Sequence, residues 1–149
     1  MKESDTLSAG NNITVFDTKW GKMGLCICYD FRFPELARLM VDLGAKIILV
    51  PAAFNMTTGP LHWELLFQSR AVDNQVFTIG TAPARNLNAS YHFYGHSIIV
   101  SPWGKILNQA DFEETALFTT INLNEINLVR EQIPLLRHRR LDIYELTQK

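Results

Sequence analysis

Apolar runs of strand length alternate with stretches of helical periodicity along the first half of this chain. Residues 14–16 alternate between apolar and polar side chains and predict a short strand, and a polar turn leads to a second predicted strand over residues 22–29. Pro34 suits the first position of a helix, where its missing N–H is not needed. Gly44 suits the carboxyl-terminal cap of that helix. Its apolar stripe is predicted to consist of Leu36, Leu39, Met40 and Leu43.

A third strand is predicted over residues 46–51, which are apolar after the first lysine, as is typical of a strand covered on both faces. Strand 22–29, the helix and strand 46–51 form a βαβ unit, which implies that the two strands are parallel. A second helix is predicted from Pro60 to about Asn74. Its apolar positions include Leu61, Leu65, Ala71 and Val72.

The rest of the chain adds strands and one more helix to this unit. A buried strand is predicted over 76–82, followed by a polar and aromatic loop over 83–95. Three further strands are predicted over 96–101, 104–107 and 116–121. The last predicted helix is capped by Asn122 or Asn124 and ends near Ile133. This order predicts an α/β fold, in which helices pack on a mixed sheet. Two helices can cover one face of that sheet, so we expect another layer on its second face.

The composition is that of a globular protein. The 149 residues suffice for one domain with its own core, and 47% hydrophobic with 19% charged residues exclude a disordered chain. A formal net charge of −1 gives no electrostatic case for binding nucleic acid or an acidic membrane surface. No apolar run approaches the ~18 residues of a membrane span, and the amino terminus lacks the apolar core of a signal peptide. We therefore expect a cytoplasmic protein.

The candidate chemistry centres on Cys28, which follows an apolar run and precedes the helix at Pro34. A thiol at the carboxyl end of a strand lies where open α/β sheets bind ligands, and it is a candidate nucleophile. Free cysteines are also common as small buried apolar residues, so position alone supports both interpretations. Cys26 lies two residues away, and their spacing along an extended strand disfavours a disulfide between them.

Other reactive groups add little. The four histidines are scattered without metal-ligand spacing, and no glycine-rich phosphate loop is present, so we expect neither a metal nor a cofactor. A Cys–His pair formed by Cys28 with His62 or His96 stays open, although the local cysteine signatures of papain-like proteases are absent. The charged residues around the turn after Cys28 predict an ion-pair and capping network of Asp30, Arg32 and Glu35.

Longer motifs give a family resemblance. Cys28 lies within Gly24-Leu-Cys-Ile-Cys-Tyr-Asp-Phe-Arg-Phe-Pro-Glu35, which resembles the nucleophile segment of the nitrilase, or carbon–nitrogen hydrolase, superfamily. The resemblance continues through residues 51–64, 69–75, 83–85, 94–104, 130–134 and 139–144. The segments Phe54-Asn-Met-Thr-Thr-Gly-Pro60 and Ala71-Val-Asp-Asn-Gln-Val76 favour the ω-amidase branch over the deaminated-glutathione amidase branch.

The resemblance implies an αββα sandwich of which residues 1–149 form a partial domain, roughly its carboxyl-terminal half. It assigns Cys28 as the nucleophile and Glu3 as a second, supporting glutamate, whereas the family's base glutamate and lysine lie upstream of the matched region. It also implies a substrate pocket that includes Phe54, Asn55 and Thr58, and a homodimer formed through the helices that follow Cys28 and Pro60.

The implied reaction is hydrolysis of a small ω-amide such as α-ketoglutaramate, with deaminated glutathione as the alternative substrate. A thioester on Cys28 would form and release ammonia, and the backbone N–H of Tyr29 would stabilise the oxyanion. Without the upstream base and lysine, we expect the isolated 149-residue chain to be inactive. The alternative is a non-catalytic remnant or binding subunit of the same fold.

Overall fold

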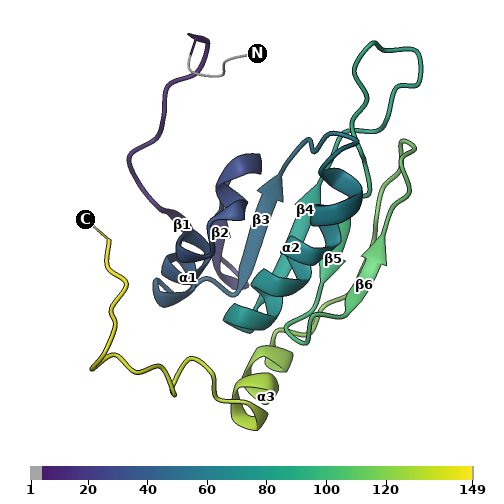
Figure 1. Ribbon diagram of the computed structural model, residues 1–149. Coiled ribbons are helices and arrows are strands. Elements are labelled where there is room, and N and C mark those ends of the chain that lie inside the picture. Colours follow the sequence, from purple (N-terminus) through teal and green to yellow (C-terminus); the bar gives the residue numbers. More distant parts are fainter. Residues whose placement is uncertain (1–4, 149) are drawn as a thin grey trace.

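Residues 5–148 are described by a computed structural model and form a single mixed sheet with helices packed against it (Figure 1). The sheet has six strands in the order β1-β2-β3-β4-β5-β6. In chain order the elements are β1 (Thr14–Thr18), β2 (Gly21–Leu25), the 3-10 helix η2 (Cys28–Arg32), α1 (Pro34–Asp42), β3 (Ile47–Pro51), α2 (Gly59–Asn74), β4 (Phe77–Thr81), β5 (Ile98–Val100), β6 (Ile106–Gln109) and α3 (Asn124–Gln132).

The predicted βαβ unit is confirmed, and a second one follows it. Strands β2, β3 and β4 are parallel, with Met23 opposite Ile47 and Ile47 opposite Phe77, and α1 and α2 form the two crossovers. The pairs β1–β2, β4–β5 and β5–β6 are antiparallel. Because the three parallel strands point the same way, their carboxyl ends lie at one edge of the sheet, where Figure 1 shows η2 beside the end of β3.

Helices α1 and α2 cover one face of the sheet and enclose the main core (Figure 1). The largest side chains in this core are fully buried, including Trp63 and Phe67 from α2 and Met40 from α1. Gly80 of β4 lies under the ring of Phe67, and a β-carbon there would approach the ring to 2.4 Å. Glycine at this position therefore lets α2 pack closely on the sheet.

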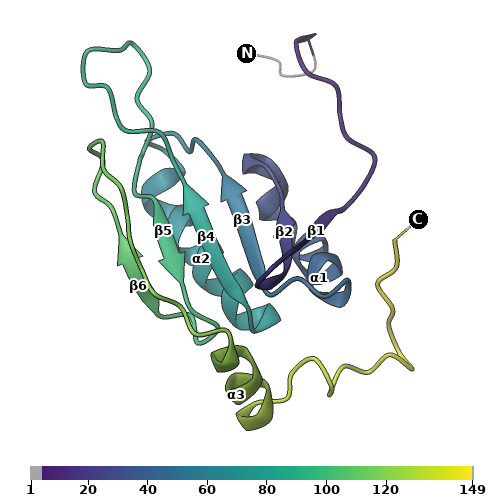
Figure 2. The ribbon, with the colours of Figure 1, turned by 180° about the vertical axis from the view of Figure 1, so that it is seen from behind.

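The second face of the sheet is covered at one end only. Ile47 and Phe77 are buried there against Ile126 of α3. Leu49 and Ile79, further along the same strands, pack against this cluster but stay partly exposed. Figure 2 shows the sheet from this side, with α3 at its lower end. The predicted α/β class is confirmed, and the expectation that the helices leave much of one sheet face open agrees with these exposures.

Both helices of the main core begin and end near their predicted positions, but only part of each predicted apolar set is buried, namely Met40 in α1 and Ala71 in α2. Gly44 adopts a φ of 100° just after α1, as a cap glycine should. In α1, however, Leu43 is 44% exposed, and the buried residues are Ala37, Met40 and Val41. In α2, three of the four predicted apolar positions are exposed: Leu61, Leu65 and Val72.

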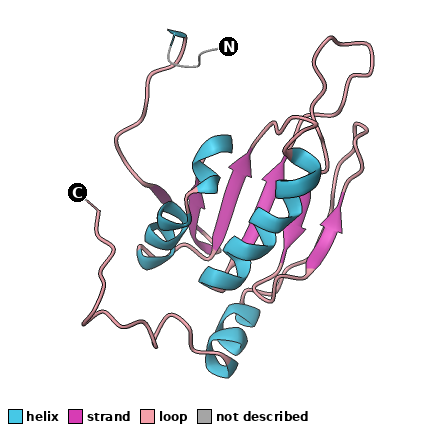
Figure 3. Ribbon diagram, viewed as in Figure 1, coloured by secondary structure: helices cyan, strands magenta, loops and turns pink. Residues whose placement is uncertain are grey.

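One predicted strand boundary and one predicted strand were wrong. The second strand ends at Leu25, so Cys28 lies in η2 and not on a strand. Residues 116–121 form no strand; Figure 3 draws the connection from β6 to α3 as loop. Phe118 is 86% exposed there, and its carbonyl accepts a hydrogen bond from the Asn108 side chain. Helix α3 begins at Asn124, and its cap is Leu123, which has no side-chain capping bond, so the predicted cap at Asn122 or Asn124 was wrong; Oδ1 of Asn122 accepts from the N–H of Asn124 just before the helix.

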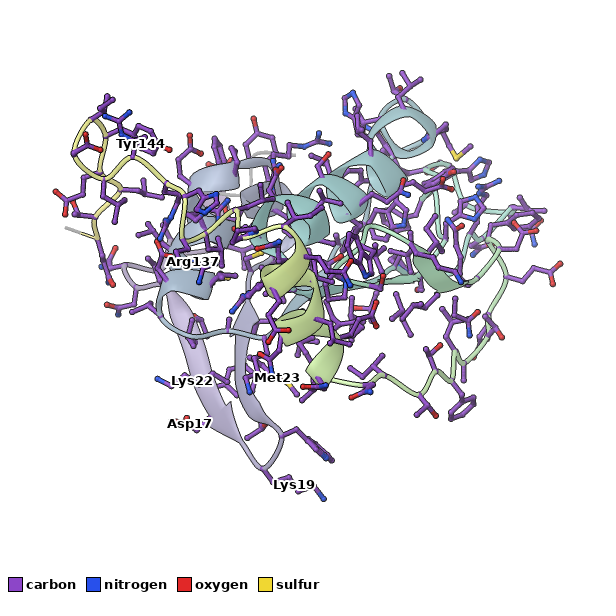
Figure 4. The ribbon with its side chains drawn as sticks, turned by 90° about the horizontal axis from the view of Figure 1, so that it is seen from below. Asp17, Lys19, Lys22, Met23, Arg137 and Tyr144 are labelled. Carbon is purple, nitrogen blue, oxygen red and sulfur yellow. The ribbon has the colours of Figure 1, made fainter. Side chains whose placement is uncertain are left out.

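Two peripheral segments complete the described chain. The β1–β2 hairpin projects from the body of the molecule, with Lys19 at its turn (Figure 4). After α3 the chain returns along α1, where both Nη atoms of Arg139 donate to the carboxylate of Asp42 at 2.9 and 2.8 Å. Among the helices of residues 5–148, none combines the length and apolar content needed to cross a bilayer.

Candidate active site

Cys28 is the first residue of η2, three residues after the end of β2. The parallel ladder continues one step past the strand, because the N–H of Cys26 donates to the carbonyl of Leu49 at 3.2 Å. The chain then turns sharply, and Cys28 adopts a φ of 50°. A non-glycine residue in this left-handed region is strained by about 1–3 kcal/mol and is held there by its surroundings.

A cavity of about 980 Å³ opens beside Cys28 at the carboxyl ends of β3 and β4. Ala52 and Ala53 follow β3, and Ala82 and Pro83 follow β4. The wall is largely apolar and consists of Ile27, Cys28, Pro51, Ala52, Ala53, Thr81, Ala82, Pro83, Tyr91 and Phe93. The prediction that Cys28 lies at the strand-end edge where α/β sheets bind ligands therefore agrees with the structure.

Helix α2 contacts the η2 turn that begins with Cys28 and stabilises it. Phe31 of η2 is 1% exposed and packs on Phe67 of α2, with 4.7 Å between the ring centroids. Nη2 of Arg70, a buried residue of the same helix, donates to the carbonyl of Arg32 at 2.8 Å. These contacts anchor the turn that begins with Cys28 and can maintain the strained backbone there.

The predicted network of Asp30, Arg32 and Glu35 was wrong, since no ion pair of residues 5–148 joins them. Arg32 instead approaches His62 on α2, with 3.0 Å between Nη1 and Nδ1. Its guanidinium also lies over the ring of Phe54, 4.5 Å from the centroid. Because a guanidinium only donates, Nδ1 of His62 is the acceptor when the two groups form a hydrogen bond.

The two thiols have different surroundings. Cys26 is 6% exposed, and burial raises the pKa of its thiol to about 12, with a smaller contribution in the same direction from Asp30 and an opposing one from Arg70. At neutral pH this thiol is protonated, which excludes it as a nucleophile. Cys28 is partly exposed and lines the cavity.

We expect iodoacetamide at pH 8 to alkylate Cys28 and to leave Cys26 unmodified in the folded protein, because only Cys28 is accessible from the cavity. As the pH rises toward the pKa of about 12, the Cys26 thiolate becomes populated, but burial still protects it. Peptide mapping by mass spectrometry measures both sites, and unfolding in urea should make them equally reactive. Modification of Cys26 at the rate of Cys28 in the folded state would contradict this assignment.

The three predicted pocket residues lie beside the cavity and not in its wall. Phe54 is 4% exposed and packs edge-on against Trp63 at 5.1 Å. Oδ1 of Asn55 accepts from the N–H of Thr57, and from both the N–H and the hydroxyl of Thr58. In this structure the side chains of Asn55 and Thr58 therefore bind each other at the start of α2, and that of Phe54 belongs to the core.

The remaining predicted site groups are a backbone N–H and a carboxylate. The N–H of Tyr29 belongs to the first turn of η2, where N–H groups have no partner within the helix. Its side chain is 62% exposed. Glu3 lies outside the described residues, so the structure does not bear on its assignment.

The aromatic side of the cavity was only partly foreseen. Tyr91 and Phe93 belong to the predicted polar and aromatic loop over 83–95, and they form that wall together, with 5.3 Å between their ring centroids. The available signal was their position in a long loop after β4, a strand parallel to β2 and β3 whose carboxyl end lies at the same edge of the sheet as theirs. Among residues 5–148 no group of three His, Cys, Asp or Glu side chains could hold a metal ion.

The chemistry that this wall supports is limited. Its strongest nucleophile is the sulfur of Cys28, beside the weaker hydroxyl groups of Thr81 and Tyr91, and none of its residues has a carboxylate, imidazole or ammonium group. A cysteine nucleophile needs a proton acceptor or a nearby cation, because a free thiol is only a few per cent ionised at neutral pH. Catalysis at this cavity therefore requires a group from outside its wall.

Comparisons with known proteins agree with this geometry. The carbon–nitrogen hydrolase family model matches residues 1–131. Omega-amidase NIT2-A of Xenopus laevis is 51% identical over 149 residues, which is 100% of this chain and 54% of the relative. The chain thus spans about half the length of the curated relatives it matches.

Solved structures give the same result. The crystal structure of Saccharomyces cerevisiae Nit3, a member of branch 10 of the nitrilase superfamily, superposes with a TM-score of 0.88 at 52% identity, over 93% of this chain and 51% of that one. The Caenorhabditis elegans NitFhit protein superposes with a TM-score of 0.91 at 37% identity, over 98% of this chain and 35% of that one.

Proposed function

Because the chain belongs to the carbon–nitrogen hydrolase family, we propose that it carries the nucleophile of an amidase that cleaves small ω-amides through Cys28. The fold is that of the nitrilase superfamily, of which the chain covers about half. The observation that carries the proposal is the position of Cys28, held at a φ of 50° at the mouth of an apolar cavity. An amide that enters this cavity meets the sulfur at the carboxyl edge of the sheet.

The proposed reaction has two steps. The Cys28 thiolate attacks the amide carbonyl, and the C–N bond breaks with transfer of one proton to nitrogen. Ammonia departs, and the acyl group remains bound to Cys28 as a thioester. Water then attacks the thioester, which yields the carboxylic acid and restores the thiol. The N–H of Tyr29, in the first turn of η2, would donate to the oxyanion in both steps.

The proton acceptor must come from elsewhere in the protein, because none of the residues of the cavity wall has a carboxylate, imidazole or amine group to take up the thiol proton. The family resemblance supplies a base glutamate and a lysine outside the matched segments, and it assigns Glu3 a supporting role. We propose that these groups complete the site in the whole protein. The 149 residues alone then hold the nucleophile without its activating base.

The relatives' names favour a substrate class. Several of them are omega-amidases, which supports an ω-amide such as α-ketoglutaramate as the substrate, with deaminated glutathione as the alternative. The largely apolar wall with Tyr91 and Phe93 is compatible with the short carbon chain of α-ketoglutaramate. No cofactor is required, since thiol addition and hydrolysis need neither redox chemistry nor a metal.

The test compares ammonia release from α-ketoglutaramate with cysteinylglycine release from deaminated glutathione, for the complete protein and for the 149-residue chain. We expect the complete protein to turn over α-ketoglutaramate faster, with an acyl-enzyme mass adduct on Cys28, and the 149-residue chain to hydrolyse neither amide above background. If the complete protein hydrolyses neither amide, the proposed ω-amidase function is refuted in favour of a non-catalytic remnant or binding subunit. Turnover by the 149-residue chain would refute the need for an outside base.

The proposed assembly is a homodimer formed through α1 and α2. Helix α2 has a stripe of exposed apolar side chains on its outer face, with Leu61 70%, Leu65 60% and Val72 42% exposed. Such a stripe is typical of a contact surface, and it agrees with the helices that the family resemblance assigns to the dimer. A free thiol at the site suits the reducing cytoplasm as the proposed compartment.

A further inference from the structure

The loop between β4 and β5 brings an aromatic wall to the cavity of Cys28. Its residues Tyr91 and Phe93 line the cavity, as does Pro83 at its start. Tyr91 is 55% exposed, so packing alone does not fix the wall. A loop of this length needs specific contacts to hold such side chains over a reactive thiol.

Arg85 supplies the first of these contacts. Its Nε donates to the carbonyl of Phe93 at 3.0 Å, and its Nη2 donates to the carbonyl of Tyr94 at 2.7 Å. The guanidinium lies over the ring of Phe112, 4.5 Å from the centroid. One side chain thus joins the two ends of the loop.

The returning end of the loop is also tied to the segment before α2. The N–H of Tyr94 donates to the carbonyl of Phe54 at 2.8 Å, and Asn55 forms an isolated antiparallel bridge with Phe93. The side chain of Asn55 is itself held by the first residues of α2. Phe93 and Tyr94 are therefore held both by the segment of Phe54 and Asn55 and by Arg85, and among the described residues only Arg85 ties them to the beginning of their own loop.

We propose that Arg85 is a positioning residue that closes this loop and thereby sets the size of the acyl group that can reach Cys28. The proposal deepens the amidase function and rests on it in one respect, that Cys28 is the nucleophile. Closure keeps Tyr91 and Phe93 over the cavity. Small amides enter beside them, and bulkier ones collide with the rings.

The use of arginine supports this role. No ion pair among the described residues includes Arg85, so its guanidinium is not neutralised by an acid in the structure. Its donors go instead to two successive main-chain carbonyls, a geometry that a guanidinium fork can span and a single ammonium cannot. Hydrogen bonds from a charged donor are stronger than neutral ones, so their loss should open the loop measurably.

The experiment measures how the size of a thiol reagent affects its rate of reaction with Cys28. It requires no amide turnover, so its outcome is independent of the test of amidase activity. In the complete protein, the rates at which N-phenylmaleimide and N-methylmaleimide modify Cys28 are measured by intact mass, with C28A as the blank. We expect Arg85→Met to raise the phenyl-to-methyl rate ratio at least about fivefold, and to speed amide hydrogen exchange over residues 86–94 by about tenfold.

Two further variants make the result specific. Arg85→Lys keeps the charge but loses the fork, so it should behave like Arg85→Met. Arg38→Met is the matched control, because Nη2 of Arg38 also donates to a main-chain carbonyl, that of Asp73, away from the cavity. It should leave the ratio unchanged. The proposal is overturned if Arg85→Lys restores wild-type selectivity, if Arg38→Met shifts the ratio equally, or if neither Arg85 variant changes it.

Discussion

Replacing Cys28 by alanine should abolish ω-amide hydrolysis by the complete protein, with a loss of kcat on the order of 10⁴-fold or more. Cys28 carries the only thiol in the cavity wall, and the proposed reaction forms a C–S bond between this thiol and the acyl carbon of the substrate. Without it, neither the thioester nor the two-step route exists. Ammonia release from α-ketoglutaramate measures the rate, and intact mass measures the acyl adduct, which should vanish.

Cys26→Ala is the matched control, since it makes the same chemical change two residues away. Cys26 is 6% exposed and does not line the cavity, so its removal should lower stability slightly and leave the rate near that of the wild type. The adduct on Cys28 should still form in this variant. Retained turnover in Cys28→Ala, or an equal loss in both variants, would refute the assignment of Cys28 as the nucleophile.

Hydrophobic periodicity was enough to predict the first βαβ unit of this fold. That unit, the strand predicted over 46–51 and the helices predicted to begin at Pro34 and Pro60 follow from local patterns, and the observed starts differ by at most one residue. Residues 116–121 did not follow their pattern. They are rich in strand-forming side chains, but β-propensity expresses packing on a sheet, and Phe118 has no such surface to pack on.

The buried face of α2 could not be chosen from the sequence. The helix has large apolar side chains on several sides, and those it buries are Trp63 and Phe67, together with the polar residues Arg70 and Asn74. Leu61 and Leu65 fit a helical stripe equally well and face outward. When a helix is apolar on more than one side, its periodicity does not define which side meets the sheet.

At the site, chain position predicted where Cys28 lies, and the family resemblance predicted its role as the nucleophile, but neither predicted its backbone geometry. The end of a strand before a helix predicted Cys28 at the ligand-binding edge, yet a φ of 50° at one residue has no local sequence signal. The contacts of Phe54 and Asn55 depend on α2 and on the loop that carries Phe93, which are distant in sequence. The role of Arg85 is likewise visible only once the loop is closed.

Trp63→Ala should have the largest effect on stability, a loss of about 3–5 kcal/mol in the free energy of unfolding. Trp63 is 0% exposed and lies between Phe54 and Phe67, with ring centroids at 5.1 and 4.7 Å. Its Nε1 also donates to the carbonyl of His96 at 2.6 Å. Truncation leaves a cavity under the sheet and an unpaired carbonyl in the segment that returns from the aromatic loop.

The measurement is urea unfolding of the complete protein followed by far-UV circular dichroism, and two variants separate the causes. Trp63→Phe keeps most of the ring packing but loses the N–H, so it should cost about 1–3 kcal/mol. Trp20→Ala removes the same side chain where it is 61% exposed, and its stability should change by less than about 0.5 kcal/mol. Because Trp63 packs against Phe54, which lies next to the bridge between Asn55 and Phe93, loss of its ring should also speed hydrogen exchange in the loop. Equal effects of the Trp63 and Trp20 truncations would mean that Trp63 does not stabilise the core as the structure indicates.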